Sequence, residues 1–418
     1  MRVHQFISHL ATDLSTRLHL DVRFYGRSFF WMSLGQMSTV VRGIATTFLM
    51  ARWIPRTTFG EFRYILAMFG LAGIFSLSGI NTSVIRGIAK GDTVIARVAA
   101  KRIFFFSLLG TLALLGLGVE RYLRGEQTVA FGLAFTAIIF PFYSLSNMYG
   151  SILTGKDEIK RLIKLAITNN LLFSILFFGI ILHWKTLIPL LIAYFGFDLL
   201  FRGYMTCREI RKLPVAGSAK EHLHLGNHLS LIGIFQAIAF QLDQVLIQAF
   251  AGYNGLANFS VATLLPEQVK DFVNSMSGII LKRFSRHEHT ESILRQTRRH
   301  FRLALLGSAV LVIGYCLCVP IVLPWLFPQY RTEVLPSMVY ALGFLAFPSI
   351  IGLSYFQAHQ NIRALWRFYA VNTILQISSN VVLIPFLGAW GGILSKTFTR
   401  LASAGLSYPA ESEKKESV

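Results

Sequence analysis

The sequence predicts an all-α polytopic membrane protein with about 12 transmembrane helices, and three observations carry this prediction. Of its 418 residues, 54% are hydrophobic and only 14% are charged, whereas soluble domains average about 25% charged residues. Long stretches such as 127–155 and 334–362 contain no Asp, Glu, Lys or Arg. Lipid offers no hydrogen-bond partners to the backbone, so these stretches have to be helical. The alternating segments of about ten residues that a membrane β-barrel needs are absent.

The expected helices follow one another from residue 28 to residue 406. A spanning helix needs roughly 17–25 mostly apolar residues. Seven expected helices match runs that are free or nearly free of charge: 64–85, 103–119, 128–150, 165–184, 303–325, 334–356 and 365–385. The other five contain charges within apolar surroundings: 28–53, 187–202, 228–250, 257–281 and 389–406. The helix at 389–406 carries two cations and is the least typical of a full span.

The Lys and Arg residues are unevenly distributed between the two sides that twelve spans define. Only seven of the 40 lie on the side opposite the termini: Arg52, Arg56, Arg63, Arg121, Arg124, Lys185 and Arg331. Lys and Arg concentrate in cytoplasmic loops, so both termini of this multi-pass protein are expected on the cytoplasmic side of the cell (inner or plasma) membrane. The net charge of +20 therefore reflects topology, with anionic membrane lipids and not nucleic acid as the expected surface partner.

The two halves of the chain repeat each other. Phe59–Phe62 loosely matches Leu256–Phe259 at an offset of 197, and Ile159–Leu172 matches Ile362–Leu375 at an offset of 203. Repeats in the same orientation are related by an axis along the membrane normal. We therefore expect two six-helix bundles with pseudo-twofold symmetry that flank a central cavity. The expected divisions are a cytoplasmic amphipathic N-terminal segment (1–27), an N-terminal bundle (28–202), a cytoplasmic connector (203–227), a C-terminal bundle (228–406) and a cytoplasmic tail (407–418).

Three segments carry a resemblance to a known family. They are "FLMARWIPRTTFGEFRYILAM" from Phe48, "GINTSVIRGIAKGD" from Gly79 and "QLDQVLIQAFAGYNGLANFS" from Gln241. From about residue 28 to 406 the chain resembles the O-antigen-type polysaccharide-biosynthesis flippases of the multidrug/oligosaccharidyl-lipid/polysaccharide exporter (MOP) superfamily. One departure is Ile54 before Pro55, where such proteins often carry Gly-Pro. The resemblance implies two six-helix bundles around a central cavity that moves a lipid-linked oligosaccharide from the cytoplasmic to the outer leaflet.

Polar and charged residues within the spans are the candidate functional residues. A charge at mid-bilayer costs about 2.5–3.5 kcal/mol on insertion scales, so it is expected in a protein-lined or wet interior. The candidates for substrate binding in the cavity are Arg42, Lys270, Gln36, Lys396 and Arg400. The candidates for ion coupling or a charge network are Glu267, Asp271 and Asp243. As alternatives, Lys270 could be neutralised on its own helix by Glu267 or Asp271. Lys396 and Arg400 could instead extend to the membrane surface.

Arg42 differs from Lys270 in having no acidic residue on its own helix, which favours its exposure to the cavity. Asp198 and Arg202 lie four residues apart near a cytoplasmic helix end. This spacing predicts a simple ion pair between them.

No motif predicts an enzyme, a cofactor or a metal site. Residues 150–157 nearly match a P-loop, but the segment ends in Asp157 where Ser or Thr has to hold magnesium, and it follows a membrane helix instead of a strand. No nucleophile elbow or pair of carboxylates that could be catalytic occurs outside the membrane. The outer loops are short, which disfavours a membrane polymerase or ligase with an external catalytic loop.

These expectations favour a flippase that acts by alternating access on a polyprenyl-diphosphate-linked oligosaccharide, for a cell-surface polysaccharide such as the O-antigen of lipopolysaccharide. A cavity arginine and lysine would bind the diphosphate by charge-assisted hydrogen bonds while the polyprenyl tail stays in the bilayer. Other polysaccharide-assembly proteins are further candidate partners. The alternatives are a cation-coupled multidrug-type antiporter of the same fold, which favours an acid-dominated cavity, and a membrane glycan polymerase or ligase.

Overall fold

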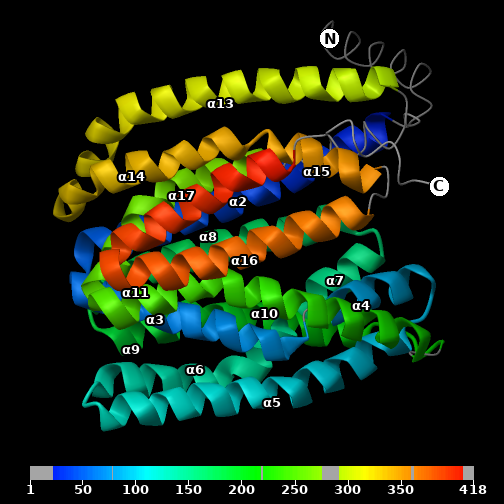
Figure 1. Ribbon diagram of the computed structural model, residues 1–418. Coiled ribbons are helices and arrows are strands. Elements are labelled where there is room, and N and C mark those ends of the chain that lie inside the picture. The colour runs from blue at the N-terminus through cyan, green and yellow to red at the C-terminus, as the bar shows by residue number, and fades with distance from the viewer. Residues whose placement is uncertain (1–21, 78, 218–219, 275–290, 359–361, 408–418) are drawn as a thin grey trace, which may run out of the picture.

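The computed structural model describes residues 22–77, 79–217, 220–274, 291–358 and 362–407, which form helices joined by short turns (Figure 1). No β-strand occurs in these ranges. The long helices run side by side, and α13 and α5 lie at opposite edges of the bundle in the view of Figure 1. The predicted all-α architecture is confirmed.

In the described residues of the N-terminal half, 22–77 and 79–211, there are six rods, meaning single helices or runs of helical segments that follow one line, and three of them are interrupted. The continuous rods are α2 (Val22–Trp53), α5 (Val94–Leu123) and α8 (Ile159–His183). The broken rods are α3, η1 and α4 (Arg56–Ala72, Gly73–Ser76, Ile80–Ala89), then α6 and α7 (Gln127–Ser146, Met148–Gly155), then α9, η2 and α10 (Leu187–Leu191, Ile192–Gly196, Phe197–Arg211). The segment η2 is a π-helical turn, a feature that often marks a functional site, and it ends two residues before Asp198.

The C-terminal half, residues 220–407, has six rods in its described part. α11 (Lys220–Asn274) comprises two rods that meet at Gly252, whose φ of 69° and ψ of −174° are accessible essentially only to glycine. The other rods are α13 (Glu291–Leu326), the broken rod of η3, α14, η4 and α15 (Pro328–Glu333, Val334–Ala341, Leu342–Ala346, Ser349–Ala358), α16 (Ile362–Leu387) and α17 (Ala389–Leu406). The described residues thus form twelve rods in two six-helix bundles, as the sequence predicts.

Eight rods in the described ranges are long and apolar enough to cross a membrane by length and composition alone. The four that are not among them are α2, the two rods of α11, and α17. These are the rods that carry the charged candidates: Arg42, then Asp243, then Glu267, Lys270 and Asp271, then Lys396 and Arg400. The less apolar helices therefore carry all of the candidate charges named above, while the apolar rods Arg56–Ser76 and Leu187–Arg211 carry further interior charges, Arg63 and Asp198.

The second rod begins earlier than the sequence analysis expected. We expected a start at residue 64, because charges interrupt the apolar sequence before it, but α3 begins at Arg56, directly after Pro55. Proline is common at helix starts, since it lacks the N–H group that would be unpaired there. Arg63, expected in a loop, is instead a helical residue about 10 Å from the start of α3 at 1.5 Å per residue.

The expected terminal segments lie mostly outside the described residues. Of the N-terminal segment (1–27), only the last residues are described, as the start of α2, and of the tail (407–418) only Ser407 is described. The connector (203–227) is helical at both ends, because α10 continues to Arg211 and α11 begins at Lys220.

The middle of the connector is bound to the N-terminal half. The backbone N–H of Thr93 donates to the carbonyl oxygen of Ala216 (3.0 Å), and its hydroxyl donates to the carbonyl oxygen of Pro214 (2.5 Å). Arg97 donates to the carbonyl oxygen of Leu213 (3.3 Å). Residues 213–216 therefore belong structurally to the N-terminal half, at the start of α5.

The two halves meet where α3 and α4 run along the first rod of α11. The backbone N–H of Gly79 donates to Ser230 Oγ (3.1 Å). Farther along, Gly60 lies so close to Tyr253 that a Cβ atom at residue 60 would overlap the carbonyl oxygen of Tyr253. The absence of a side chain at Gly60 therefore allows the two backbones to approach each other.

Two contacts between the halves lie on the pseudo-twofold axis. Thr57 Oγ1 donates to Asn254 Oδ1 (3.2 Å), and Arg63 Nε donates to Ser260 Oγ (3.0 Å). Each pair is separated by 197 positions, which is the offset of the predicted repeat. Equivalent residues of a two-fold pair can contact each other only at the axis, so these four residues place the axis between α3 and the second rod of α11.

The halves are joined at the end of the bundle that holds Pro55 and Gly252, which we call the closed end. Four further polar contacts cross between the halves at this end: Arg52 Nη1 to the Trp325 carbonyl oxygen (3.4 Å), Gln329 Nε2 to the Arg52 carbonyl oxygen (3.4 Å), Arg121 Nη2 to Gln248 Oε1 (3.0 Å), and the Tyr253 hydroxyl to Glu126. The two bundles are therefore in contact at the closed end.

Candidate functional site

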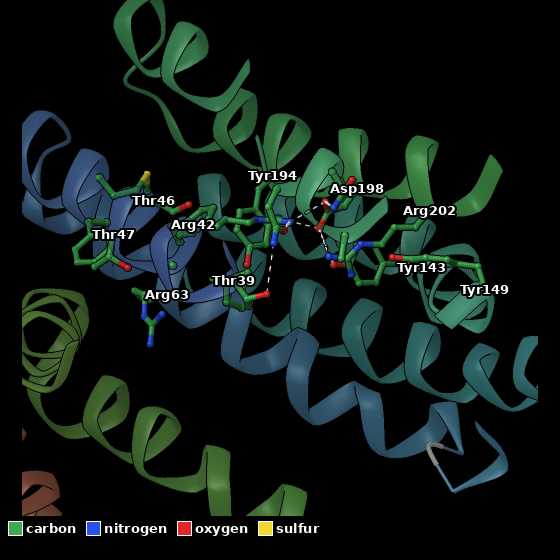
Figure 2. Close-up of a pocket in the computed structure, with 18 residues that line it drawn as sticks. Thr39, Arg42, Thr46, Thr47, Arg63, Tyr143, Tyr149, Tyr194, Asp198 and Arg202 are labelled. Atoms are coloured by element: carbon green, nitrogen blue, oxygen red, sulfur yellow. Dashed lines mark hydrogen bonds and ion pairs between the residues drawn. The ribbon is translucent and has the colours of Figure 1, made fainter. Parts of the chain in front are cut away.

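A cavity of about 340 Å³ lies within the N-terminal half, between α2, α3, α6, α8 and α10 (Figure 2). Its volume is within the range of small-molecule sites. Its aromatic lining residues are Phe59, Phe62, Tyr143, Tyr149 and Tyr194, and its hydroxyl and amide residues are Thr39, Thr46, Thr47, Asn169 and Asn170. Its charged lining residues are Arg42, Arg63, Asp198 and Arg202. Three arginines and one aspartate give the described lining an excess of positive charge.

Arg42 is held by a bidentate ion pair with Asp198. Nη2 lies 2.8 Å from Oδ2 and Nη1 lies 3.1 Å from Oδ1, while Nη1 also donates to Asn170 Oδ1 (3.2 Å). The guanidinium lies over the Phe173 ring, 3.6 Å from its centroid. Only 9% of Arg42 and 1% of Asp198 are exposed. The bidentate pair and the ring together fix the orientation of the guanidinium plane.

Asp198 binds more partners than the spacing of four predicts. Its Oδ2 pairs with Arg202 Nη2 (3.2 Å), as expected, so Arg42 and Arg202 approach the carboxylate from opposite sides (Figure 2). Asn169 Nδ2 donates to Oδ1 (2.9 Å), and the Tyr143 hydroxyl donates to Oδ2 (3.4 Å). The expected simple ion pair is therefore one part of a buried network in which one carboxylate serves two guanidinium groups.

Arg63 is a lining residue that the sequence analysis missed. It points away from Asp198 in Figure 2, toward α11. Its Nε donates to Ser260 Oγ (3.0 Å) and its Nη2 donates to Gln244 Oε1 (3.4 Å). Pro55 was the available signal, since a helix that begins after it places Phe59, Phe62 and Arg63 on neighbouring faces of one helix.

Glu267 is the centre of a second cluster, in the C-terminal half. Lys270 and Arg400 both pair with its carboxylate, and the Tyr340 hydroxyl donates to it. Arg400 Nη2 also donates to the Tyr340 hydroxyl oxygen (3.0 Å), with its guanidinium 4.6 Å from the centroid of that ring. Lys270 is thus neutralised on its own helix by Glu267, one of the two alternatives considered, and Arg400 is directed into the bundle.

Asp243 forms the other charged contact that we describe in the C-terminal half. Its side chain is fully buried and lies 2.7 Å, Oδ2 to Nζ, from Lys396 of α17. The Lys396 ammonium also lies 5.4 Å from the centroid of the Phe259 ring. Lys396 is therefore directed into the bundle and does not extend to the membrane surface.

Two of the residues singled out from the sequence take no part in these clusters. Gln36 is exposed on α2, and Asp271 makes no ion pair with any residue that the structure describes. The remaining candidates are divided between the N-terminal cavity and the two C-terminal contacts.

In the described ranges, no group of three or more His, Cys, Asp or Glu residues could hold a metal ion. Most of the P-loop-like segment, residues 150–155, is helical and belongs to α7.

Solved structures with the same fold define the class of the protein. The chain is similar to an inward-facing multidrug resistance MATE family transporter of the MOP superfamily, with a TM-score of 0.66 and 13% identity over 91% of this chain and 96% of that one. It is also similar to the lipid II flippase MurJ in an inward closed conformation, with a TM-score of 0.65 and 14% identity over 90% and 86%. A third is a MOP superfamily transporter from Pyrococcus furiosus, with a TM-score of 0.56 and 14% identity over 91% and 93%. The protein thus has the fold of the multi-pass MOP membrane transporters.

The family follows from the sequence match. Residues 25–286 match the family described as polysaccharide biosynthesis protein. This is more than half of the chain, and the chain belongs to that family. No individually curated protein matches the chain significantly.

Proposed function

We propose that this protein is a flippase that moves a polyprenyl-diphosphate-linked oligosaccharide from the cytoplasmic to the outer leaflet of the inner membrane, for a cell-surface polysaccharide such as O-antigen. Its membership of the polysaccharide biosynthesis family supports the class of product. Its likeness in fold to the lipid II flippase MurJ supports a flippase mode of transport.

The observation that carries the proposal is the positive charge of the N-terminal cavity. A diphosphate is a multiply charged anion, and burying it in lipid without partners is very costly. Arg42 and Arg202 share one carboxylate, Asp198, and Arg63 has no ion pair among the described residues, so the three guanidinium groups keep an excess of positive charge. Their planar shape suits phosphate oxygens. The threonine and asparagine side chains around them could bind sugar hydroxyls. Lys270, Lys396, Arg400 and Gln36 stay predicted substrate contacts elsewhere along the path.

A cation-coupled antiporter of the same fold is less well supported. Such a transporter needs a carboxylate that is available to a proton or metal cation, but Asp198, Asp243 and Glu267 each bind a cationic side chain of the protein. Among the coupling candidates this leaves Asp271, which makes no ion pair in the described residues and lies outside the cavity lining. The Pyrococcus furiosus relative is described in the words "reverse polarity of binding pocket suggests different function".

The proposed direction of transport requires both termini and the connector in the cytoplasm, with the closed end facing outward. With Cys207, Cys316 and Cys318 replaced by serine, a cysteine at the exposed Arg124 is expected to react with a membrane-impermeant maleimide added to intact cells. A cysteine at the exposed Val215, in the connector, should react only after the cells are opened. Labelling of Val215→Cys from outside would reverse the proposed orientation.

The function is tested by reconstitution in liposomes with a fluorescent polyprenyl-diphosphate oligosaccharide, scoring how much label becomes protected from an external quencher. Arg42→Ala is expected to insert normally, because Asp198 keeps Arg202, Asn169 and Tyr143 as partners. It should nevertheless lose transport about tenfold to hundredfold, since a hydrogen bond to a charged group contributes about 1.5–3 kcal/mol. Arg42→Lys should recover this only in part, because an ammonium cannot bind two oxygens with a planar fork.

The matched control is Arg331→Ala, which removes an exposed arginine of η3 that lies outside the cavity lining. It is expected to transport at the wild-type rate. Liposomes that accumulate an organic cation in exchange for protons, driven by a proton gradient, but do not move the lipid-linked sugar, would favour the antiporter instead.

A further inference from the structure

Arg63 is the charged residue of the cavity lining whose hydrogen bonds are made to the opposite half of the protein. Arg42 and Arg202 bind Asp198 within the N-terminal half. Arg63 lies on α3, yet both of its hydrogen-bond acceptors, Ser260 and Gln244, lie on α11 of the C-terminal half. Its guanidinium therefore belongs at once to the cavity wall and to the contact between the bundles.

The partners of Arg63 are weak compared with a phosphate group. Within the described residues Arg63 makes no ion pair, and a serine hydroxyl and a glutamine amide oxygen are neutral acceptors. The bond to Gln244, at 3.4 Å, is longer than the usual 2.7–3.2 Å for an N–H donor. The guanidinium already makes these bonds charge-assisted, but a phosphate oxygen adds a full negative charge on the acceptor, which neither Ser260 nor Gln244 supplies. An anionic ligand in the cavity would therefore compete successfully for this guanidinium.

Arg63 lies where the two bundles contact each other, so competition for its guanidinium would affect the contact between them. The Arg63–Ser260 contact lies on the pseudo-twofold axis, as does the Thr57–Asn254 contact. Six residues separate Thr57 from Arg63 along α3, or about 9 Å of helix. Arg63 thus lies in the cavity wall less than two helical turns from the closed end, with the lining residues Phe59 and Phe62 between it and Thr57 along α3.

We propose that Arg63 couples occupancy of the cavity to opening of the closed end: a bound diphosphate draws the guanidinium away from Ser260 and Gln244 and so removes polar links that hold the bundles together. The proposal rests on the proposed function, because it takes the diphosphate as the ligand. It assigns Arg63 a positioning role between the bundles in addition to its charge. A ligand can shift such an equilibrium only through different interactions with the two states, and Arg63 supplies that difference.

The test measures ligand binding and opening on the same protein. In a cysteine-free background, spin labels at Lys185→Cys and Arg331→Cys, two exposed positions in opposite halves, report the distance between the bundles in lipid nanodiscs. The probe is geranylgeranyl diphosphate, with geranylgeraniol as the uncharged control, and its affinity is measured by calorimetry. The wild type is expected to bind the diphosphate and to shift toward longer distances by at least about fivefold in population, the lower end of typical couplings between sites.

Two variants separate the coupling from general stability. Ser260→Ala removes one acceptor of Arg63 and should raise the open population before any probe is added, with probe affinity unchanged or higher. Its matched control is Ser308→Ala. Like Ser260, Ser308 donates its hydroxyl to the carbonyl oxygen four residues earlier, but it lies on α13, and this bond stays within that helix. Arg63→Gln should fold, bind the diphosphate more weakly, and show no probe-dependent shift even at saturating probe.

The outcomes distinguish the coupling from the function. Diphosphate binding to the wild type without any change in distance, or a Ser260→Ala protein that matches Ser308→Ala, would overturn the coupling and leave the flippase proposal intact. Failure of the wild type to bind the diphosphate at all would overturn both.

Discussion

Replacing Asp198 with alanine is expected to destabilise the N-terminal half by about 3–5 kcal/mol, the usual cost of removing one partner from a buried ion pair. Asp198 is 1% exposed and binds Arg42 and Arg202. Without it, both guanidinium groups stay in the interior with no carboxylate in contact among the described residues. The yield of monodisperse protein in detergent and the midpoint of thermal unfolding should both fall.

The control for this prediction is Asp271→Ala, which removes an acidic residue of a membrane helix that makes no ion pair in the described ranges. It is expected to unfold at nearly the wild-type temperature. The double variant Arg42→Ala with Asp198→Ala should lose less stability than the sum of the losses in the single variants. It lacks one of the two guanidinium groups that Asp198→Ala leaves buried without a carboxylate. Wild-type unfolding of Asp198→Ala would show that the buried network does not stabilise the fold.

A covalent link between residues 57 and 254 is expected to abolish transport. Thr57 Oγ1 and Asn254 Oδ1 are 3.2 Å apart across the closed end, so cysteines at the two positions should be joined by a short bifunctional reagent. Alternating access requires the bundles to separate at each end in turn, and the link prevents separation at the closed end. Flipping in liposomes should cease in proportion to the linked fraction and return when a reducible linker is cleaved.

The matched control is a cysteine pair at Asn81 and Ser151. These side chains are also 3.2 Å apart, but both lie in the N-terminal half, on α4 and α7. Their link should leave transport unchanged, because the two helices move together. Full transport by protein completely linked between residues 57 and 254 would exclude alternating access through the closed end.

The helices could be predicted because lipid imposes one requirement along the whole chain, namely internal backbone hydrogen bonds. The last helix, which carries Lys396 and Arg400, has the same bounds in the structure as in the prediction, Ala389–Leu406. The helix breaks could not be predicted. The π-helical turn at Ile192–Gly196 follows an uninterrupted apolar sequence. Packing between helices decides where such turns form, and the periodicity of the sequence carries no information about that packing.

The charged residues could be located from the sequence, but only some of their partners could be found. Spacing along one helix predicted the contacts Lys270–Glu267 and Arg202–Asp198. It could not predict that Arg42 binds Asp198, since 156 residues separate them. Arg63 was missed for a related reason: a charge was read as the end of a span, although its side chain has neutral partners on another helix.

The attachment of residues 213–216 to the start of α5 sets a geometric limit on the transport cycle. Ala216 is bonded to Thr93, and Lys220 already belongs to the first rod of the C-terminal half. Four peptide units span at most about 14 Å when fully extended. The connector is therefore a short tether, and the start of α5 and the start of α11 stay neighbours throughout the cycle. Separation of the bundles at the closed end is then a rotation that keeps the start of α5 beside the start of α11, not a sliding of one bundle away from the other.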